Sequence, residues 1–381
     1  MFDGLLGYLV PLVITETGLS KTVMGIIFGS SSIFGALFDF LLSKYLRNSH
    51  FKRLFLIMFA TCLFYPLVLW QAKTITVFLI AMAMWGLYYD LSNFGDFDFV
   101  GRQKNHYEHA KQFGVISVFK SLGYLLSPII AGLLIGQVVS WEPFAFAWII
   151  LGFSISFFIV LKKTAKDILP SPTIRLVRKI SIKKELNLWR NIGLLILPAL
   201  ILTMLLNVMD AFFWTIGPLF AENFTAIHPF NGLFLAAYTL PALLVGWMVG
   251  KVTKVFGKKR SAFFCFLIGS ILLLLFYKIQ NPFILMFTIF IASFFFGLSW
   301  PAINGAYADY ISESNRYEKE IEGLEDFATN VGYVVGPMAA GYLADKAGNI
   351  PAFSLLGVVG IVFSLILLRF TPKSINIPQN P

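Results

Sequence analysis

Long apolar segments recur along the whole chain, and their length limits what it can fold into. Each is near the roughly 20 residues that an α-helix needs to cross about 30 Å of hydrocarbon. Hydrophobic residues make up 57% of the chain, more than a soluble protein of this size buries. Uninterrupted helices satisfy their own backbone groups in lipid, and the weak alternation of a membrane β-barrel is missing. The sequence therefore predicts an all-α, multi-pass membrane protein. The predicted spans are residues 22–44, 51–71, 75–98, 112–137, 142–162, 190–221, 229–252, 260–278, 282–310, 324–345 and 350–370.

The positive charges are unevenly placed between these spans. The net charge is +10, and 25 of the 30 lysines and arginines lie in every second loop. Such an excess is typical of cytoplasmic loops, so the charge indicates topology and not a nucleic-acid partner. We expect a protein of the plasma (inner) membrane whose middle loop and C-terminus face the cytoplasm.

One pattern occurs twice in the chain. The stretch from Gly86 to Asp98 matches residues 211 positions later, and the stretch from Gly123 to Gly132 matches residues 209 positions later. This duplication in one orientation predicts two helix bundles in a parallel repeat. The expected domains are an N-terminal bundle at 1–162, a cytoplasmic linker at 163–188 and a C-terminal bundle at 189–381.

The first apolar run is too short to span. Asp3 and Pro11 match Asp210 and Pro218, each 207 positions later, so the opening residues correspond to the second part of the seventh helix. By this match, we expect about 15 to 20 residues of a full first span to be missing from the sequence. A natural protein with a short first helix is the alternative.

These features resemble the major facilitator superfamily over essentially the whole chain. That family has two six-helix bundles in parallel repeat, with a substrate cavity between them. Its loop motif after the second helix is matched by Gly35 and Asp39, after which the sequence departs from the motif. The related place after the eighth helix keeps Gly250 and Gly257 but has Lys254 instead of an acid. The resemblance implies the major facilitator fold, with the first helix truncated.

A small-residue motif on the fifth helix is similar to one found in exporting members of that family. Proline removes a backbone donor and bends a helix, while small residues let helices approach closely. Because the motif occurs in both halves, a packing role stands beside a role in export. The positions expected to act in gating and packing are Gly35, Asp39, Gly123, Pro128, Gly132, Gly250, Gly257, Gly336, Pro337 and Gly341.

Two acids occupy matching places inside helices one and seven. An ionisable side chain deep in a span costs at least ~2.5 kcal/mol, so each is a candidate site. Asp210 shares a helix face with Asn207 and Trp214, and helices one and seven line the cavity in the family that the chain resembles. We expect Asp210 and Asp3 to bind a proton or cation; a structural hydrogen-bonding role is the alternative.

Asp90 and Lys120 form a second candidate pair. Both lie at a similar depth in helices four and five, so we expect them to meet, either as a structural ion pair or as a substrate contact. Further residues expected to line the substrate cavity are Asn93, Trp300, Asn304, Asn330 and Tyr333.

The leading interpretation is a secondary active transporter of a small solute that works by alternating access with proton-coupled export. The sequence lacks a Walker loop, a nucleophile with its base and clustered metal ligands, so we expect no enzyme activity, cofactor or metal. A cation-coupled symporter that imports a polar solute such as a sugar, or a non-transporting receptor, remains open. The expected partners are a small-molecule substrate, protons and the lipid bilayer, and the resemblance implies a monomer.

Overall fold

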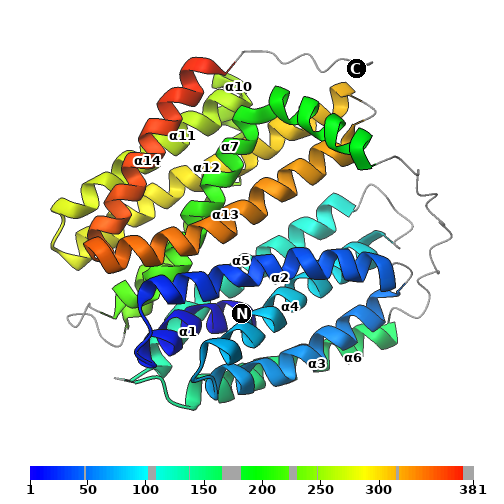
Figure 1. Ribbon diagram of the computed structural model, residues 1–381, viewed down its shortest axis with the longest axis vertical. Coiled ribbons are helices and arrows are strands. Elements are labelled where there is room, and N and C mark those ends of the chain that lie inside the picture. Colours follow the sequence, from blue (N-terminus) through cyan, green and yellow to red (C-terminus); the bar gives the residue numbers. More distant parts are fainter. Residues whose placement is uncertain are drawn as a thin grey trace. The chain divides into compact units, whose positions relative to one another are not determined.

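The computed structural model describes residues 1–46, 49–101, 109–136, 138–164, 182–222, 230–246, 248–314 and 317–371 (Figure 1). Every regular element within these ranges is a helix, which confirms the predicted all-α class. Most of the predicted linker 163–188 lies outside the described residues, although α7 already begins at Ile182.

The helices follow the predicted spans closely in the first half of the chain. They are α1 (Phe2–Glu16), α2 (Lys21–Tyr45), α3 (Phe51–Trp70), α4 (Ile75–Gly101), α5 (His109–Leu134) and α6 (Glu142–Thr164). The second half is more interrupted. It contains α7 (Ile182–Ala221), η4 (Phe230–Gly232), α8 (Leu233–Thr239), α9 (Pro241–Val245), α10 (Val249–Phe256), α11 (Lys258–Leu274), η5 (Leu275–Lys278), α12 (Pro282–Ser314), α13 (Glu318–Ala347) and α14 (Asn349–Phe370).

Nine helices in the described part of the chain are long and apolar enough to cross a membrane. The predicted span 229–252 contains a pair of helical segments, Phe230–Val245 and Val249–Phe256, bent by 70°, and counts as a tenth candidate span if the pair is one broken span. The predicted span 324–345 lies within α13, whose 30 residues are long enough, but acids such as Glu325 and Asp326 make it more polar than the others. The chain is an integral, multi-pass membrane protein.

The chain forms two compact units. One contains Met1–Ile174, Trp214–Ala236 and Pro337–Tyr342, and the other contains Arg175–Phe213, Ala237–Gly336 and Leu343–Pro381. The first unit thus includes the end of α7 and a short piece of α13. The domain boundaries at residues 162 and 188 stay a prediction.

The first unit depends on close helix crossings. In it, α3 and α2 both pack on α4, and α1 packs on α5. A Cβ atom on Gly86 of α4 would lie 2.5 Å from the backbone oxygen of Ser31 and 2.8 Å from the amide nitrogen of Gly35 on α2. Only glycine permits this approach, because the two backbones are in direct contact.

In the second unit, α11 packs against both α12 and α14. The α11–α14 contact again uses a glycine, since a Cβ atom on Gly357 would lie 2.6 Å from the amide nitrogen of Leu274. Fully buried aromatic rings fill the same unit, with Phe213 and Phe353 separated by 4.8 Å between centroids. The hydrophobic effect does not drive helices together within lipid. Close packing of small residues at the crossings, and of aromatic rings between the helices, holds them together instead.

We predict that Gly86→Ala lowers the stability of the protein by about 1–3 kcal/mol, because the added methyl group overpacks the α2–α4 crossing. Gly114→Ala on α5 is the matched control, since a Cβ atom there would meet nothing within 4 Å. Thermal unfolding of the purified protein in detergent measures both. Equal midpoints for the two variants would contradict the tight crossing.

Candidate functional site

The first acid of the chain lies in a cluster of hydrogen-bond donors. Asp3 is only 8% exposed, because α1 is buried from Phe2 to Ile14. The indole nitrogen of Trp85 donates to its Oδ1 at 3.0 Å, and the hydroxyl group of Tyr89 donates to its Oδ2 at 2.9 Å. The hydroxyl group of Tyr124 on α5 also donates to Oδ2. Asp3 therefore accepts three hydrogen bonds from aromatic side chains of α4 and α5.

The matching acid of the second half, Asp210, is half-buried and also accepts hydrogen bonds from aromatic side chains. Tyr238 donates to Oδ1 of Asp210 at 2.8 Å, and Tyr333 of α13 donates to Oδ2 at 2.8 Å. The ring of Phe213 stacks on Tyr238 with 4.1 Å between centroids, which fixes the ring of that tyrosine. A carboxylate with tyrosine donors can hold its charge at low cost, and a proton can be added to it without removing those partners.

The two clusters repeat each other. Asp3 and Asp210 are 207 positions apart, and their tyrosine donors Tyr124 and Tyr333 are 209 positions apart, within the two copies of the duplicated motif. The sequence predicted the pair of acids but did not assign Tyr124 to a site. The Gly-Tyr step shared by the two motif copies was the signal that pointed to it. We refer to these groups as the Asp3 cluster (Asp3, Trp85, Tyr89 and Tyr124) and the Asp210 cluster (Asp210, Tyr238 and Tyr333).

The predicted contact between Asp90 and Lys120 is wrong. Lys120 of α5 instead pairs with Asp96 of α4, with 3.0 Å between Nζ and Oδ2. Asp90 is 9% exposed, and its buried Oδ2 has no hydrogen-bond partner among the described residues. The similar depth of Asp90 and Lys120 in their helices did not make them partners. The flexible side chain of Lys120 reaches Asp96, which lies further along α4.

Among the described residues, the remaining predicted cavity residues do not form one cluster. Asn207 is buried and donates to the carbonyl oxygen of Thr203 at 2.8 Å and to Oγ1 of Thr329 at 3.2 Å, which is a structural arrangement. The ring of Trp214 lies 5.6 Å from that of Tyr124, beside the Asp3 cluster. Their roles in a cavity stay predictions, as do those of four residues that are half-buried or exposed: Trp300, Asn330, Asn93 and Asn304.

The duplicated motif also makes the tightest backbone contacts of the first unit. A Cβ atom on Gly232 of η4 would lie 1.9 Å from the carbonyl oxygen of Pro128, and one on Gly25 of α2 would lie 2.1 Å from that of Pro337. Gly25 and Gly232 are themselves 207 positions apart, so the two contacts are equivalent in the repeat. A Cβ atom on Gly341 would lie 2.0 Å from the carbonyl oxygen of Lys21 in the same region.

The other motif positions are less demanding. Gly35 lies beneath Asp90, since a Cβ atom on it would be 3.6 Å from the Oδ1 atom of that acid. Gly257 joins α10 to α11 at a φ of 79°, a conformation that favours glycine. Gly250 has nothing within 4 Å of its Cβ position. No group of three or more His, Cys, Asp or Glu side chains in the described ranges is placed to hold a metal ion.

The sequence is similar to known proteins over part of its length. The model of the Major Facilitator Superfamily matches residues 199–381. The Quinolone resistance protein NorA of Staphylococcus aureus is 26% identical over 145 residues, which cover 38% of this chain and 37% of the relative. The match therefore spans little more than a third of these curated relatives.

The fold is similar to solved structures over nearly the whole chain. The nucleoside transporter NupG aligns with a TM-score of 0.76 at 13% identity, covering 98% of this chain and 97% of that one. The D-xylose-proton symporter aligns with a TM-score of 0.70 at 14% identity, covering 98% and 96%. A bacterial homolog of the human lysosomal transporter Spinster aligns with a TM-score of 0.70 at 12% identity, covering 97% and 92%. These likenesses concern the fold, and they confirm that the predicted all-α fold is that of these solved transporters.

We predict opposite effects for two conservative substitutions of buried acids. Asp3→Asn places an amide against three donors, so it lowers the stability of the protein by about 1–3 kcal/mol. Asp90→Asn removes an ionisable group whose buried oxygen has no donor in the described part of the chain, so stability is unchanged or higher. Thermal unfolding in detergent at neutral pH compares the two. An equal loss of stability in both variants would contradict the difference between the two environments.

Proposed function

We propose that this chain, which has the major facilitator fold, is a secondary active transporter that moves a small solute across the membrane by alternating access. We propose further that transport is coupled to protons and directed outward. The substrate is bound and released unchanged, so no residue is given a catalytic role. These proposals rest on the acid clusters, the family match and the pattern of charges.

The observation that carries the coupling proposal is the repeated pairing of an acid with tyrosine donors, at Asp3, which is buried, and at Asp210, which is half-buried. A charged carboxylate within a span is costly unless it is hydrogen-bonded, and a protonated one is neutral and can itself donate. The Asp3 cluster and the Asp210 cluster therefore each offer a group that can change its charge without losing all its partners. Such a group can couple the binding of a proton to the conformation of the surrounding helices.

The outward direction is supported by similarity alone. The motif from Gly123 to Gly132 resembles that of exporting members of the superfamily, and the partial relative is named for quinolone resistance, which outward transport of a compound would produce. Both arguments come from similarity to other proteins, so the experiment below measures the direction of transport.

A cation-coupled symporter is the second candidate, and one observation favours it. Asp90 is buried and its Oδ2 has no hydrogen-bond partner among the described residues, while Gly35, one turn before Asp39 on α2, lies against its Oδ1. Two acids on neighbouring helices, one of them with a free buried oxygen, suit a bound cation better than a lone acid does. In this case Asp90, and not Asp210, would carry the coupling ion.

The topology is proposed from the distribution of charge. The ends of the helices that carry most lysines and arginines, together with the C-terminus, are assigned to the cytoplasmic side of the plasma (inner) membrane. The transporter is proposed to act as a monomer.

We predict that Asp210→Asn abolishes substrate-dependent proton flux while substrate binding persists. The protein is reconstituted in proteoliposomes with a pH gradient, compounds are screened with a pH-sensitive dye, and the sign of the flux gives the direction. Asp309→Asn is the matched control, because Asp309 is 51% exposed in a surface ion pair with Lys258 and its loss costs at most about 1 kcal/mol.

Three outcomes would contradict parts of the proposal. Flux that survives in Asp210→Asn but is lost in Asp90→Asn favours the cation symporter. Equal loss of flux in Asp210→Asn and Asp309→Asn denies the Asp210 cluster a specific role. Saturable binding with no flux of any solute or ion identifies a receptor.

A further inference from the structure

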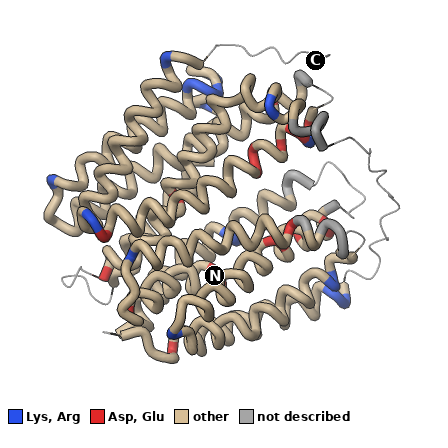
Figure 2. Tube along the Cα trace, in the orientation of Figure 1, with Lys and Arg blue, Asp and Glu red and all other residues tan. Residues whose placement is uncertain are grey.

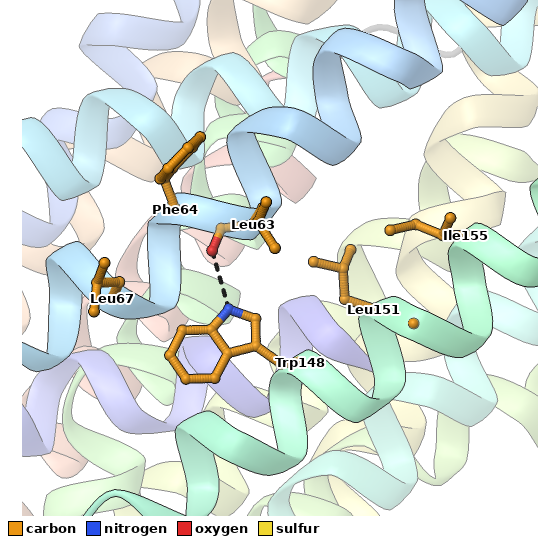
Figure 3. Close-up of a pocket in the computed structure, with 7 residues that line it drawn as sticks. Leu63, Phe64, Leu67, Trp148, Leu151 and Ile155 are labelled. Carbon is orange, nitrogen blue, oxygen red and sulfur yellow. Dashed lines mark hydrogen bonds between the residues drawn. The ribbon is translucent and has the colours of Figure 1, made fainter.

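An apolar groove lies between α3 and α6, both of which are candidate membrane spans within the first unit. Its volume is about 330 Å³. Figure 3 shows its lining side chains, which are Leu63, Phe64, Leu67, Trp148, Leu151 and Ile155. Phe64 is 57% exposed and Leu63 is 51% exposed, so the groove is open at the surface that these spans present to lipid.

The groove is a defined feature of the two helices and not a gap between loose side chains. The indole nitrogen of Trp148 donates to the backbone oxygen of Leu63 at 3.0 Å, which fixes the ring between the helices (Figure 3). A tryptophan N–H within a span needs such an acceptor. Gly152 lies one turn further on α6, and a Cβ atom there would meet nothing within 4 Å, so this residue leaves the groove open.

One end of the same helix pair is strongly basic. The helices run in opposite directions, because Phe55 lies beside Phe158 at 5.8 Å between ring centroids while Leu63 lies beside Trp148. The start of α3 therefore meets the end of α6. Lysine and arginine positions gather at this end of the Cα trace in Figure 2. On these two helices they are Lys52, Arg53, Lys162 and Lys163.

We propose that the groove and the basic end together bind one anionic phospholipid. The phosphate group lies at the basic end, and one acyl chain runs along the α3–α6 seam into the groove. Lys52 and Leu63 are 11 positions apart on α3, so roughly 16 Å separate the charge from the groove. This is close to half of the ~30 Å hydrocarbon core, the depth to which the acyl chain of one leaflet extends.

Charge complementarity selects this occupant over others. A neutral lipid would use the groove but not the four cations, and a free phosphate would use the cations but not the groove. A second copy of this chain would bring the same basic residues and so repel. An anionic lipid is the partner that uses both the groove and the cations. Basic segments at membrane surfaces attract anionic lipids in general.

The test is native mass spectrometry of the full-length purified protein, titrated with phosphatidylglycerol or with phosphatidylcholine of identical acyl chains. We expect one site at which phosphatidylglycerol binds about 10-fold more tightly or better. Lys162→Gln with Lys163→Gln is expected to weaken phosphatidylglycerol binding about 10-fold and to leave phosphatidylcholine unchanged. The matched control is Lys251→Gln with Lys254→Gln on α10, two exposed lysines of the other unit.

The acyl chain is tested separately from the headgroup. Gly152→Leu fills the groove and is expected to weaken both lipids several-fold, while Gly114→Leu, at another exposed helical glycine without neighbours, leaves both unchanged. Should Gly152→Leu fail to fold, Phe64→Ala removes one wall of the groove and is expected to weaken both lipids in the same way. Equal affinity for the two lipids, equal effects of the two double lysine variants, or full binding to a blocked groove overturns the proposal. Occupancy of the groove by a second copy of the chain, seen as a dimer that excludes lipid, also overturns it.

Discussion

The hydrogen bonds that tyrosine and tryptophan side chains donate to Asp3 and Asp210 are the interactions on which the candidate site depends. A charged acid packed among apolar helices is costly unless hydrogen-bond donors on neighbouring helices replace the water that it loses. The three donors described for Asp3 come from α4 and α5, and one donor to Asp210 comes from α13. Each acid therefore holds together helices that are distant in sequence. Protonation of the acid changes the strength of the hydrogen bonds that hold those helices in place.

The duplicated motif joins this chemistry to the packing of the helices. On α5, Tyr124 reaches Asp3, while Pro128 one turn later presents its carbonyl oxygen to Gly232. On α13, Tyr333 reaches Asp210, while Pro337 one turn later presents its carbonyl oxygen to Gly25. In the proposed transporter, the same short segment thus hydrogen-bonds an acid and packs against the start of another helix. Both copies of the duplicated motif make this pair of contacts.

The features that could be predicted from the sequence are those set by length, charge and repetition. Long apolar runs predicted the helices, and the 207-residue offset paired Asp3 with Asp210. What failed was the contact of Asp90 with Lys120, because spacing along a helix gives depth in the bilayer but not which neighbour a flexible side chain reaches. The α3–α6 groove could not be predicted either, since it depends on which helices are neighbours and on the open position at Gly152. Tyr124 could have been found, because the repeat places it where Tyr333 stands.

Proton coupling through Asp210 is tested by observing this residue gain and lose its proton in the membrane. Infrared difference spectroscopy of the reconstituted protein across pH, taken for the wild type and for Asp210→Asn, isolates the carboxyl stretching band of this residue. We predict a band that appears as pH falls and that shifts in Tyr333→Phe, because that substitution removes one donor to the carboxyl group. A band that neither changes with pH nor responds to Tyr333→Phe would show that Asp210 is a fixed structural acid and not a proton carrier.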